Sequence, residues 1–322
     1  MISLLWIQML SAFELIIAVS YAGSYGVLQS VSLLWNLRRI GTRWDVTKDS
    51  QKPFPSKQLP RASFLSSLQT QIIFTCVAYL LLDLTASAPQ PPAMLLQPSK
   101  QALWKGVFEL SLPDAAFRFI GSVGFYVSTA ILLSVVHSTV VAMGAVLNWW
   151  DFDSCVPLFG SVSEAYTVRK FWGSVWHQCL RRLLTGPADL ISDSILRIPR
   201  GTLLSRYSRL LLAFTISGAL HHAGDIAVGV RPQDAGGGRF FILQGLVIML
   251  EDFVQHIVAT NSSLARNSPA RDQIFKRIGF VWVLCVMAWS TPTWFYPMQR
   301  LGIDPAALLP FRVIPRVGAL IG

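Results

Sequence analysis

The chain has 322 residues, of which 52% are hydrophobic and only 14% are charged, and its formal net charge is +10 at pH 7. Soluble domains carry about 25% charged residues, so this composition excludes an ordinary soluble domain and indicates a protein of the lipid bilayer. The positive charge is concentrated in alternate loops, which is typical of membrane topology. We therefore expect the bilayer, and no nucleic acid, as the partner of the basic residues.

Six apolar runs are long enough to cross a bilayer, because a transmembrane helix needs about 20 residues. They lie at 3–36, 68–88, 117–147, 203–222, 239–259 and 276–297. The first run has the length of one long pass or two tight ones. The predicted fold is all-α and polytopic, with about six to eight transmembrane helices in a single membrane domain over residues 1–322.

The first apolar run starts at Met1 without a basic leading segment or a small-residue cleavage site. It also exceeds the apolar length of a signal peptide, so we expect a retained anchor. In the absence of another address signal, the endoplasmic reticulum is the expected membrane of this multi-pass protein.

The loops between the runs differ in their content of Lys and Arg. Loop 37–67 carries seven and loop 148–202 carries six, whereas loop 223–238 carries only Arg231. Because cytoplasmic loops are enriched in Lys and Arg, the two basic loops are expected to face the cytosol. Contact with lipid headgroups is the simplest role for any one of these residues.

Segment 168–185 contains the sequence FWGSVWHQCLRR, with two tryptophans, a histidine and two arginines. At about 100° per residue, Trp172 and Trp176 fall on one face, and His177 and Arg181 fall on the opposite face. The pattern predicts one amphipathic helix over 168–185 that lies at the membrane interface. A helix that only anchors the chain is the alternative.

The sequence FTISGALHHAGD places ionisable side chains at the end of an apolar run. If the helix continues, His221 and Asp225 lie on one face, and the carboxylate could fix the imidazole tautomer so that the other nitrogen accepts a proton. Ser217 and its small neighbours would leave room for a substrate. Ionisable groups inside a membrane are candidates for function, although a hydrogen bond to a neighbouring helix is the alternative.

A second group of polar residues, Glu251, Asp252 and His256, lies in another apolar run. These residues could line the same cavity or form hydrogen bonds between helices. Five histidines and four scattered cysteines show no zinc spacing, so no metal site is predicted, while a mixed site of histidines and carboxylates stays open. The sequence has no P-loop and no nucleophile elbow. A histidine base without a nucleophilic residue favours direct attack by a bound acceptor on an activated donor.

The two motifs together, about forty residues apart, resemble the wax synthase-like branch of the membrane-bound O-acyltransferases, especially fungal members that acetylate terpenoid and meroterpenoid alcohols. The FWxxxWHQ and SGxxH patterns are matched by Phe171, Trp172, Trp176, His177 and Gln178, and by Ser217, Gly218 and His221. The resemblance covers residues 150–230. Ser174 and Val175 stand where an arginine-rich pair is common, and His222 stands where plant-type members have Glu, which leaves the base open between His221 and His222.

The resemblance implies an acyl-CoA-dependent O-acyltransferase that uses acetyl-CoA as a co-substrate, a hydrophobic terpenoid alcohol as the acceptor and no bound cofactor. His221 would be the general base, with His177 and Asp225 as further catalytic residues. Arg181 and Arg182 would pair with the phosphates of CoA, or with lipid headgroups. The remaining residues implied to bind substrate are Trp172, Trp176, Gln178, Ser217 and His222.

Three other functions stay open at this point. The same chemistry could join a long-chain acyl-CoA to a fatty alcohol or a sterol. A membrane terpene cyclase would use carboxylic acids and need no CoA. A transporter or scaffold could use the intramembrane histidines and carboxylates as a proton relay or as packing contacts, but the repeat symmetry common in transporters is not visible in the sequence.

Overall fold

The computed structural model describes residues 61–104, 109–147, 157–260, 269–304 and 309–314. The predicted apolar run 3–36 lies outside these residues. Throughout the described part the regular structure is helical, which confirms the prediction of an all-α polytopic membrane protein. The described residues form two compact units, of which one comprises 159–260 and 269–294 and the other comprises the rest.

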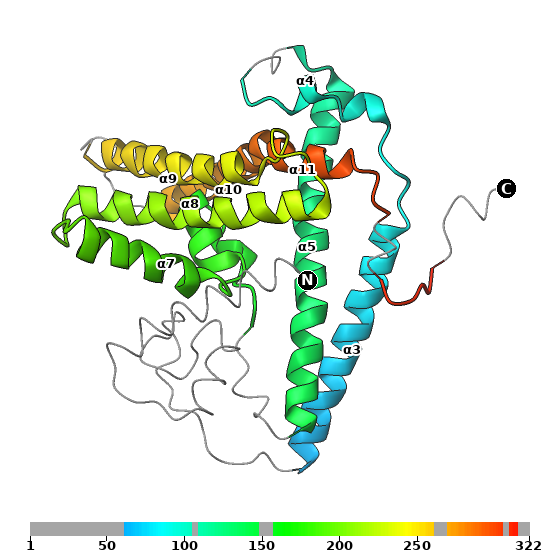
Figure 1. The fold of residues 1–322 in the computed structure, drawn as a ribbon. Helices are drawn as coiled ribbons and strands as arrows, with labels where there is room; N and C mark the ends of the chain where they lie inside the picture. Colours follow the sequence, from blue (N-terminus) through cyan, green and yellow to red (C-terminus); the bar gives the residue numbers. More distant parts are fainter. Residues whose placement is uncertain (1–60, 105–108, 148–156, 261–268, 305–308, 315–322) are drawn as a thin grey trace. The chain divides into compact units, whose positions relative to one another are not determined.

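In the second unit, two long apolar helices run antiparallel and pack side by side (Figure 1). They are α3 (Arg61–Ala86) and α5 (Leu112–Val146), and the short helices η1 (Ala93–Leu95) and α4 (Pro98–Gln101) lie between them in the sequence. Large apolar side chains such as Phe74 and Val136 are about half exposed on these helices. An apolar surface of this kind suits the hydrocarbon of a bilayer.

Asp83 shows how the second unit accommodates a carboxylate inside an apolar helix. Its side chain is fully buried. It pairs with Arg312 and accepts hydrogen bonds from the backbone N–H groups of Val313 and Ile314, both at 2.7 Å. The C-terminal described segment is therefore fixed to the end of α3, because a buried carboxylate needs donors around it.

The first unit contains the remaining helices up to α10 and the start of α11, and it carries both sequence motifs. Its elements are η4 (Val162–Glu164), α6 (Val168–Lys170), η5 (Phe171–Val175), α7 (Arg181–Leu190), η6 (Ile191–Ile195), α8 (Leu203–Val228), α9 (Gly237–Thr260) and α10 (Pro269–Ser290), followed by α11 (Pro292–Gln299). Helices α8 and α9 run antiparallel side by side, with α7 packed on α8 (Figure 1) and α6 packed on α9.

Helix α8 has caps at both ends that set its length. The Thr202 hydroxyl accepts a hydrogen bond from the backbone N–H of Ser205 at 3.1 Å, and Gly229 ends the helix with φ of 113°. A positive φ favours glycine because it has no Cβ. The helix therefore continues beyond the predicted end at residue 222 and includes Asp225, as the interpretation of the second motif requires.

Five described helices are long and apolar enough to cross a membrane. These spans are Leu65–Ala86, Leu112–Gly144, Leu203–Val228, Gly237–Thr260 and Asp272–Ser290. Each overlaps a predicted apolar run. The prediction of a pass near 276–297 is confirmed by the span Asp272–Ser290, but the pass ends earlier than predicted, because α10 ends at Ser290 and a new helix starts at Pro292. Proline has no N–H to continue the preceding helix, but it suits a first helical turn.

The prediction of one amphipathic helix over 168–185 is wrong. Helix α6 is a single turn, η5 is a π-helical turn, and Trp176 has an extended backbone before α7 starts at Arg181. The N–H of Trp176 donates to the carbonyl of Phe171 at 2.7 Å, which is the i to i+5 bond of a π-helix. Such turns are rare and are frequent at functional sites.

Glu251 of α9 fixes the start of this segment. Its buried carboxylate accepts hydrogen bonds from the backbone N–H groups of Val168 at 2.8 Å and Arg169 at 3.1 Å, and from the indole of Trp282 at 3.1 Å. The neighbouring Asp252 pairs with Arg169 at 2.6 Å. Of the two roles considered for Glu251 and Asp252, contacts between elements are therefore the observed one.

We expect Glu251→Ala to lower the unfolding temperature of the protein in detergent, because three donors lose their acceptor. Each buried unpaired donor costs about 1–3 kcal/mol. The matched control is Glu164→Ala, since Glu164 is a half-exposed carboxylate that pairs with Lys170 at 2.5 Å. A pair of this kind contributes about 0–1 kcal/mol. Equal shifts of the unfolding temperature in the two variants would contradict the role of Glu251.

Candidate active site

Gln178 explains why the first motif folds back instead of forming one helix. Its amide nitrogen donates to the carbonyls of Trp172 at 3.1 Å and Trp176 at 2.5 Å. Arg181 donates to the carbonyl of Gly173 at 2.9 Å and to the amide oxygen of Gln178 at 3.2 Å. These side chains satisfy backbone groups that a continuous helix would have paired internally. The sequence predicted that Gln178 binds substrate, and in the structure its amide shapes the turn.

The two tryptophans of the motif lie in one cluster of aromatic rings. Trp172 contacts Phe240 and Phe241 of α9, with ring centroids 6.1 and 5.5 Å apart. Trp176 is stacked on Phe171, with centroids 5.6 Å apart and an interplanar angle of 24°. These contacts place the motif against α9, and Trp172 also contacts Phe214 of α8, the helix that carries the second motif.

A buried chain of polar groups, which the sequence analysis did not single out, fixes Trp172. The indole N–H of Trp172 donates to the side-chain oxygen of Gln244 at 3.3 Å, and the amide nitrogen of Gln244 donates to the hydroxyl of Ser290 at 3.0 Å. Both Gln244 and Ser290 are fully buried. The signal that could have identified Gln244 is an uncharged polar residue within an apolar run.

His177 was predicted on the polar face of a helix, and the structure instead places it in the aromatic cluster. Its ring lies 5.4 Å from that of Trp176 and 6.1 Å from that of Phe159. Burial lowers the pKa of His177 to about 4, because the charged form loses its hydration. Its buried Nδ1 has no hydrogen-bond partner in the described part of the chain. The imidazole is therefore neutral at pH 7 and has a nitrogen available for a ligand.

His221 of α8 lies beside two aromatic side chains that also contact each other. The ring of Phe241 is stacked on it, with centroids 4.4 Å apart and an interplanar angle of 8°, and Trp294 lies at 4.8 Å and 59°. A series of ring contacts connects His221 with His177, because Phe241 contacts Trp172, and Trp172 contacts Trp176, the neighbour of His177. The fold thus brings together the two histidines that the motifs singled out.

Asp225 is not the tautomer-fixing partner of His221 that the sequence predicted. One carboxylate oxygen accepts from the indole N–H of Trp294 at 2.8 Å, and the other accepts from the backbone N–H of Gly237 at 3.0 Å. The side chain is 4% exposed. The hydrogen bonds of Asp225 therefore connect α8 to Trp294 and to the start of α9.

The glycines before and at the start of α9 allow it to approach the second motif. A Cβ at Gly237 would lie 2.9 Å from the Cβ of His221, and one at Gly236 would lie 1.8 Å from the carbonyl oxygen of Thr293. Gly218 is used in the same way, since a Cβ there would lie 3.1 Å from the carbonyl oxygen of Gly238. Gly218, one of the small residues predicted to leave room for a substrate, therefore serves the packing of α8 against α9.

The other predicted site residues lie around this core. Ser217 is buried on α8, and the ring of His222 lies near Gly238, where a Cβ would be 4.0 Å from Nδ1 of the histidine. Arg181 is exposed and Arg182 is partly exposed in the first turn of α7. Of the two candidate bases, His221 is the one whose ring contacts belong to the aromatic cluster that contains His177.

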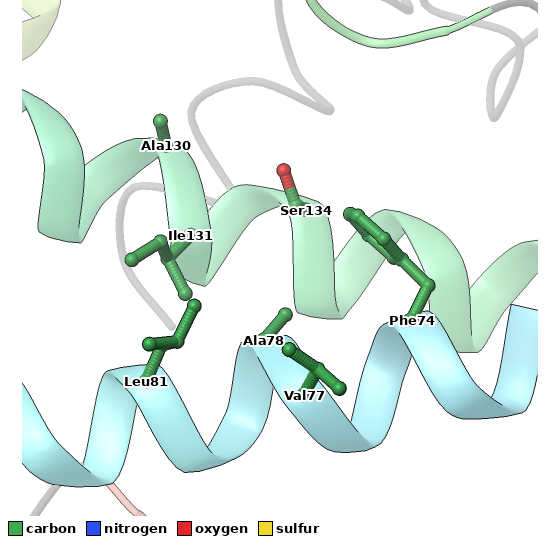
Figure 2. Close-up of a pocket in the computed structure, with 7 residues that line it drawn as sticks. All are labelled: Phe74, Val77, Ala78, Leu81, Ala130, Ile131 and Ser134. Carbon is green, nitrogen blue, oxygen red and sulfur yellow. The ribbon is translucent and has the colours of Figure 1, made fainter.

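No group of three His, Cys, Asp or Glu side chains that could hold a metal ion occurs in the described residues. The second unit has a cavity of about 190 Å³ between α3 and α5 (Figure 2). It is lined by Phe74, Val77, Ala78, Leu81, Ala130, Ile131 and Ser134. Because none of these side chains titrates near neutral pH, the cavity offers no acid or base for a reaction.

Similarity to known proteins identifies the family of the chain. A model of the family described as "Membrane bound O-acyl transferase family" matches residues 155–243, which include both motifs. Acetyltransferase pyr8 of Aspergillus fumigatus is 31% identical, over 98% of this chain and 76% of its own length. The chain belongs to the membrane-bound O-acyltransferase family. The resemblance seen in the two motifs is thereby confirmed.

Two further relatives of this acyltransferase cover most of the chain. Acetyltransferase atnC of Arthrinium sp is 29% identical over 91% of the chain and 67% of its own length. Acetyltransferase ataH of Aspergillus terreus is 29% identical over 87% of the chain and 91% of its own length. The chain spans less than two thirds of several other relatives. No solved structure matches it.

The free energy of unfolding is expected to fall as the pH drops from 6.5 toward 4. The pKa of His177 is about 4 in the folded chain against an ordinary 6.5, so the unfolded chain binds more protons in this window. Acid therefore favours unfolding, by up to about 3 kcal/mol. Denaturant titration of the protein in detergent at several pH values measures this loss.

Two variants separate His177 from other causes of acid sensitivity. His177→Gln should flatten the dependence on pH in this window. Phe159→Leu changes a ring in contact with His177 and removes no titratable group, so it should keep the slope. An unchanged slope in His177→Gln would show that His177 is not held neutral by the fold.

Proposed function

We propose that this acyltransferase transfers an acetyl group from acetyl-CoA to the hydroxyl group of a hydrophobic terpenoid alcohol. The observation that carries the proposal is the position of His177 and His221, which are far apart in the sequence, in one aromatic cluster. The relatives of the chain that are named acetyltransferases support the acetyl donor.

His221 is the general base in this proposal. It accepts the hydroxyl proton as the alcohol oxygen attacks the thioester carbonyl, a new C–O bond forms, and the C–S bond breaks. The proton passes from the imidazolium to the CoA thiolate, so the products are the ester and free CoA. Base catalysis of this kind contributes about 10² to 10⁴-fold, and positioning of the two substrates supplies much of the rest.

His177 polarises the donor. Its neutral imidazole can donate one N–H hydrogen bond, and the buried Nδ1 that lacks a partner in the described part of the chain can carry that proton. A donor aimed at the thioester oxygen stabilises the negative charge that develops there as the alcohol attacks. The roles of base and hydrogen-bond donor are thus assigned to two histidines in the same cluster.

A short acyl group fits the surroundings of His221 better than a long one. The rings of Phe241 and Trp294 lie within 5 Å of the imidazole, and Phe241 is almost fully buried. Because these large rings lie so close to the base, a small acyl group is the kind that fits beside it while the rings stay in place. The alternative, a long-chain acyl-CoA, would need these rings to move.

The CoA phosphates are expected to contact the start of α7. Arg181 uses one of its terminal nitrogens for the turn of the first motif, and its guanidinium has further N–H groups that can pair with phosphate. Arg182 follows in the same helical turn. A cytosolic position for this basic segment would give it access to acyl-CoA, in keeping with a protein of the endoplasmic reticulum.

The first test measures release of free thiol from acetyl-CoA by membranes that contain the full chain, with a panel of terpenoid alcohols. We expect release that depends on the alcohol and that falls by about 10² to 10⁴-fold in His221→Ala. The matched control is His256→Ala, because His256 is an exposed histidine on α9. Turnover by His221→Ala equal to that of the unmodified chain would exclude His221 as the base.

The donor is tested in the same membranes by competition. Acetyl-CoA should outcompete long-chain acyl-CoA, whereas preferred use of the long chain would replace the acetyl donor in the proposal. Release that needs no alcohol would indicate hydrolysis instead of transfer.

We expect Arg181→Ala combined with Arg182→Ala to raise the KM for acetyl-CoA about tenfold, with a smaller effect on the KM for the alcohol, because two phosphate contacts are lost. Arg197→Ala is the matched control, since Arg197 is an exposed arginine of the same basic loop. Equal changes in both KM values, or no change in either, would indicate instead that the two arginines contact lipid headgroups.

A further inference from the structure

The base of the proposed reaction lacks the carboxylate that usually stabilises a charged imidazole. Among the described residues, the two oxygens of Asp225 are bonded to Trp294 and Gly237, and no carboxylate is in hydrogen-bond contact with His221. When the imidazole accepts the hydroxyl proton it becomes a cation in a partly buried site beside two aromatic rings. Such a cation needs a source of negative potential, because burial removes its hydration.

Two aromatic rings lie within the range in which a ring attracts a cation, and the ring of Phe241, which is almost parallel to the imidazole, presents its face to it. The ring centroids of Phe241 and Trp294 are 4.4 and 4.8 Å from that of His221. A cation within about 6 Å of a ring centroid is attracted by the negative face of the ring, most strongly by that of tryptophan. The two rings are therefore placed to stabilise the imidazolium that forms on His221 during transfer.

Asp225 strengthens this effect through Trp294. The buried carboxylate accepts the indole N–H at 2.8 Å, and a negative acceptor polarises the donor ring toward greater electron density. Trp172 offers a contrast in the same cluster, since its indole N–H donates to the neutral amide of Gln244. Of these two tryptophans, the one in contact with His221 is therefore the one whose indole N–H donates to a carboxylate.

We propose that Asp225 and Trp294 are positioning residues that stabilise the imidazolium of His221 during acyl transfer, with the carboxylate acting through the indole and not on the histidine itself. The inference rests on the proposed function, in which His221 takes the hydroxyl proton as the ester C–O bond forms and then returns it to the CoA thiolate. The interaction is strongest while His221 is charged, so it lowers the barrier and leaves substrate binding unchanged.

The experiment replaces Trp294 in the full chain with tryptophans that carry one to four fluorine atoms. Fluorine withdraws electron density from the face of the ring and changes its shape little, so the attraction for a cation declines stepwise. It also makes the indole N–H more acidic, so the hydrogen bond to Asp225 is kept along the series. We expect log kcat to fall steadily with each fluorine, by between about twofold and thirtyfold over the series. The KM values for acetyl-CoA and the alcohol should stay constant, which a merely structural role would not require.

The matched control is the same fluorinated series at Trp282. Its indole N–H also donates to a buried carboxylate, Glu251 at 3.1 Å, but the described rings in contact with His221 are those of Phe241 and Trp294. We expect no trend in kcat at Trp282. A flat series at Trp294, or equal slopes at the two positions, would overturn the inference.

A second variant tests the carboxylate. Trp294→Phe keeps a ring beside His221 but removes the N–H bond to Asp225, so Asp225→Asn should lower kcat less in the Trp294→Phe background than in the unmodified chain. Full additivity of the two changes would overturn the link between them. If the unmodified chain shows no alcohol-dependent transfer with any donor, the proposed function and the inference fail together, whereas a dead His221→Ala with a flat Trp294 series removes the inference alone.

Discussion

The two hydrogen bonds of the Asp225 carboxylate hold the candidate active site together. Asp225 lies on α8, and its oxygens accept from the start of α9 and from the first turn of α11, 69 residues away in the sequence. A buried carboxylate whose donors are lost leaves an unsatisfied charge, which is far more costly than an unsatisfied neutral group. The carboxylate therefore fixes the distance between α8 and α9 and the place of Trp294 against His221.

Glu251 plays the same structural role at the first motif, as a buried carboxylate that accepts several N–H hydrogen bonds. It lies inside an apolar helix and accepts hydrogen bonds from backbone and indole N–H groups, as Asp225 does. In each case the donors come from segments distant in the sequence. Carboxylates satisfied by neutral N–H groups suit a protein with few charges, because they join helices without requiring a buried cation as well. The glycines at 236 and 237 complement them, since close approach of backbones makes these short bonds reachable.

Several features of the site could be predicted because they depend on local pattern. Apolar length identified the runs that became α3, α5, α8 and α9, and the motifs identified His177 and His221. Predictions failed where a distant partner decided the outcome. Helical periodicity could not foresee that Gln178 would bond the carbonyls of Trp172 and Trp176 and break the helix. Spacing of four residues put Asp225 on the face of His221 but could not show that Trp294 would take its oxygen.

The sequence by itself determined that this is an all-α membrane protein, that two histidine motifs are the candidates for its chemistry, and that it resembles the membrane-bound O-acyltransferases. These properties follow from composition, apolar length and short-range spacing, which are readable along the chain. Only the tertiary structure decided which side chains surround each histidine. It put Phe241 and Trp294 around His221, and Phe159 beside His177. The physical reason is that burial and hydrogen bonding depend on which helices pack together, and packing joins residues whose separation in the sequence carries no signal of their contact.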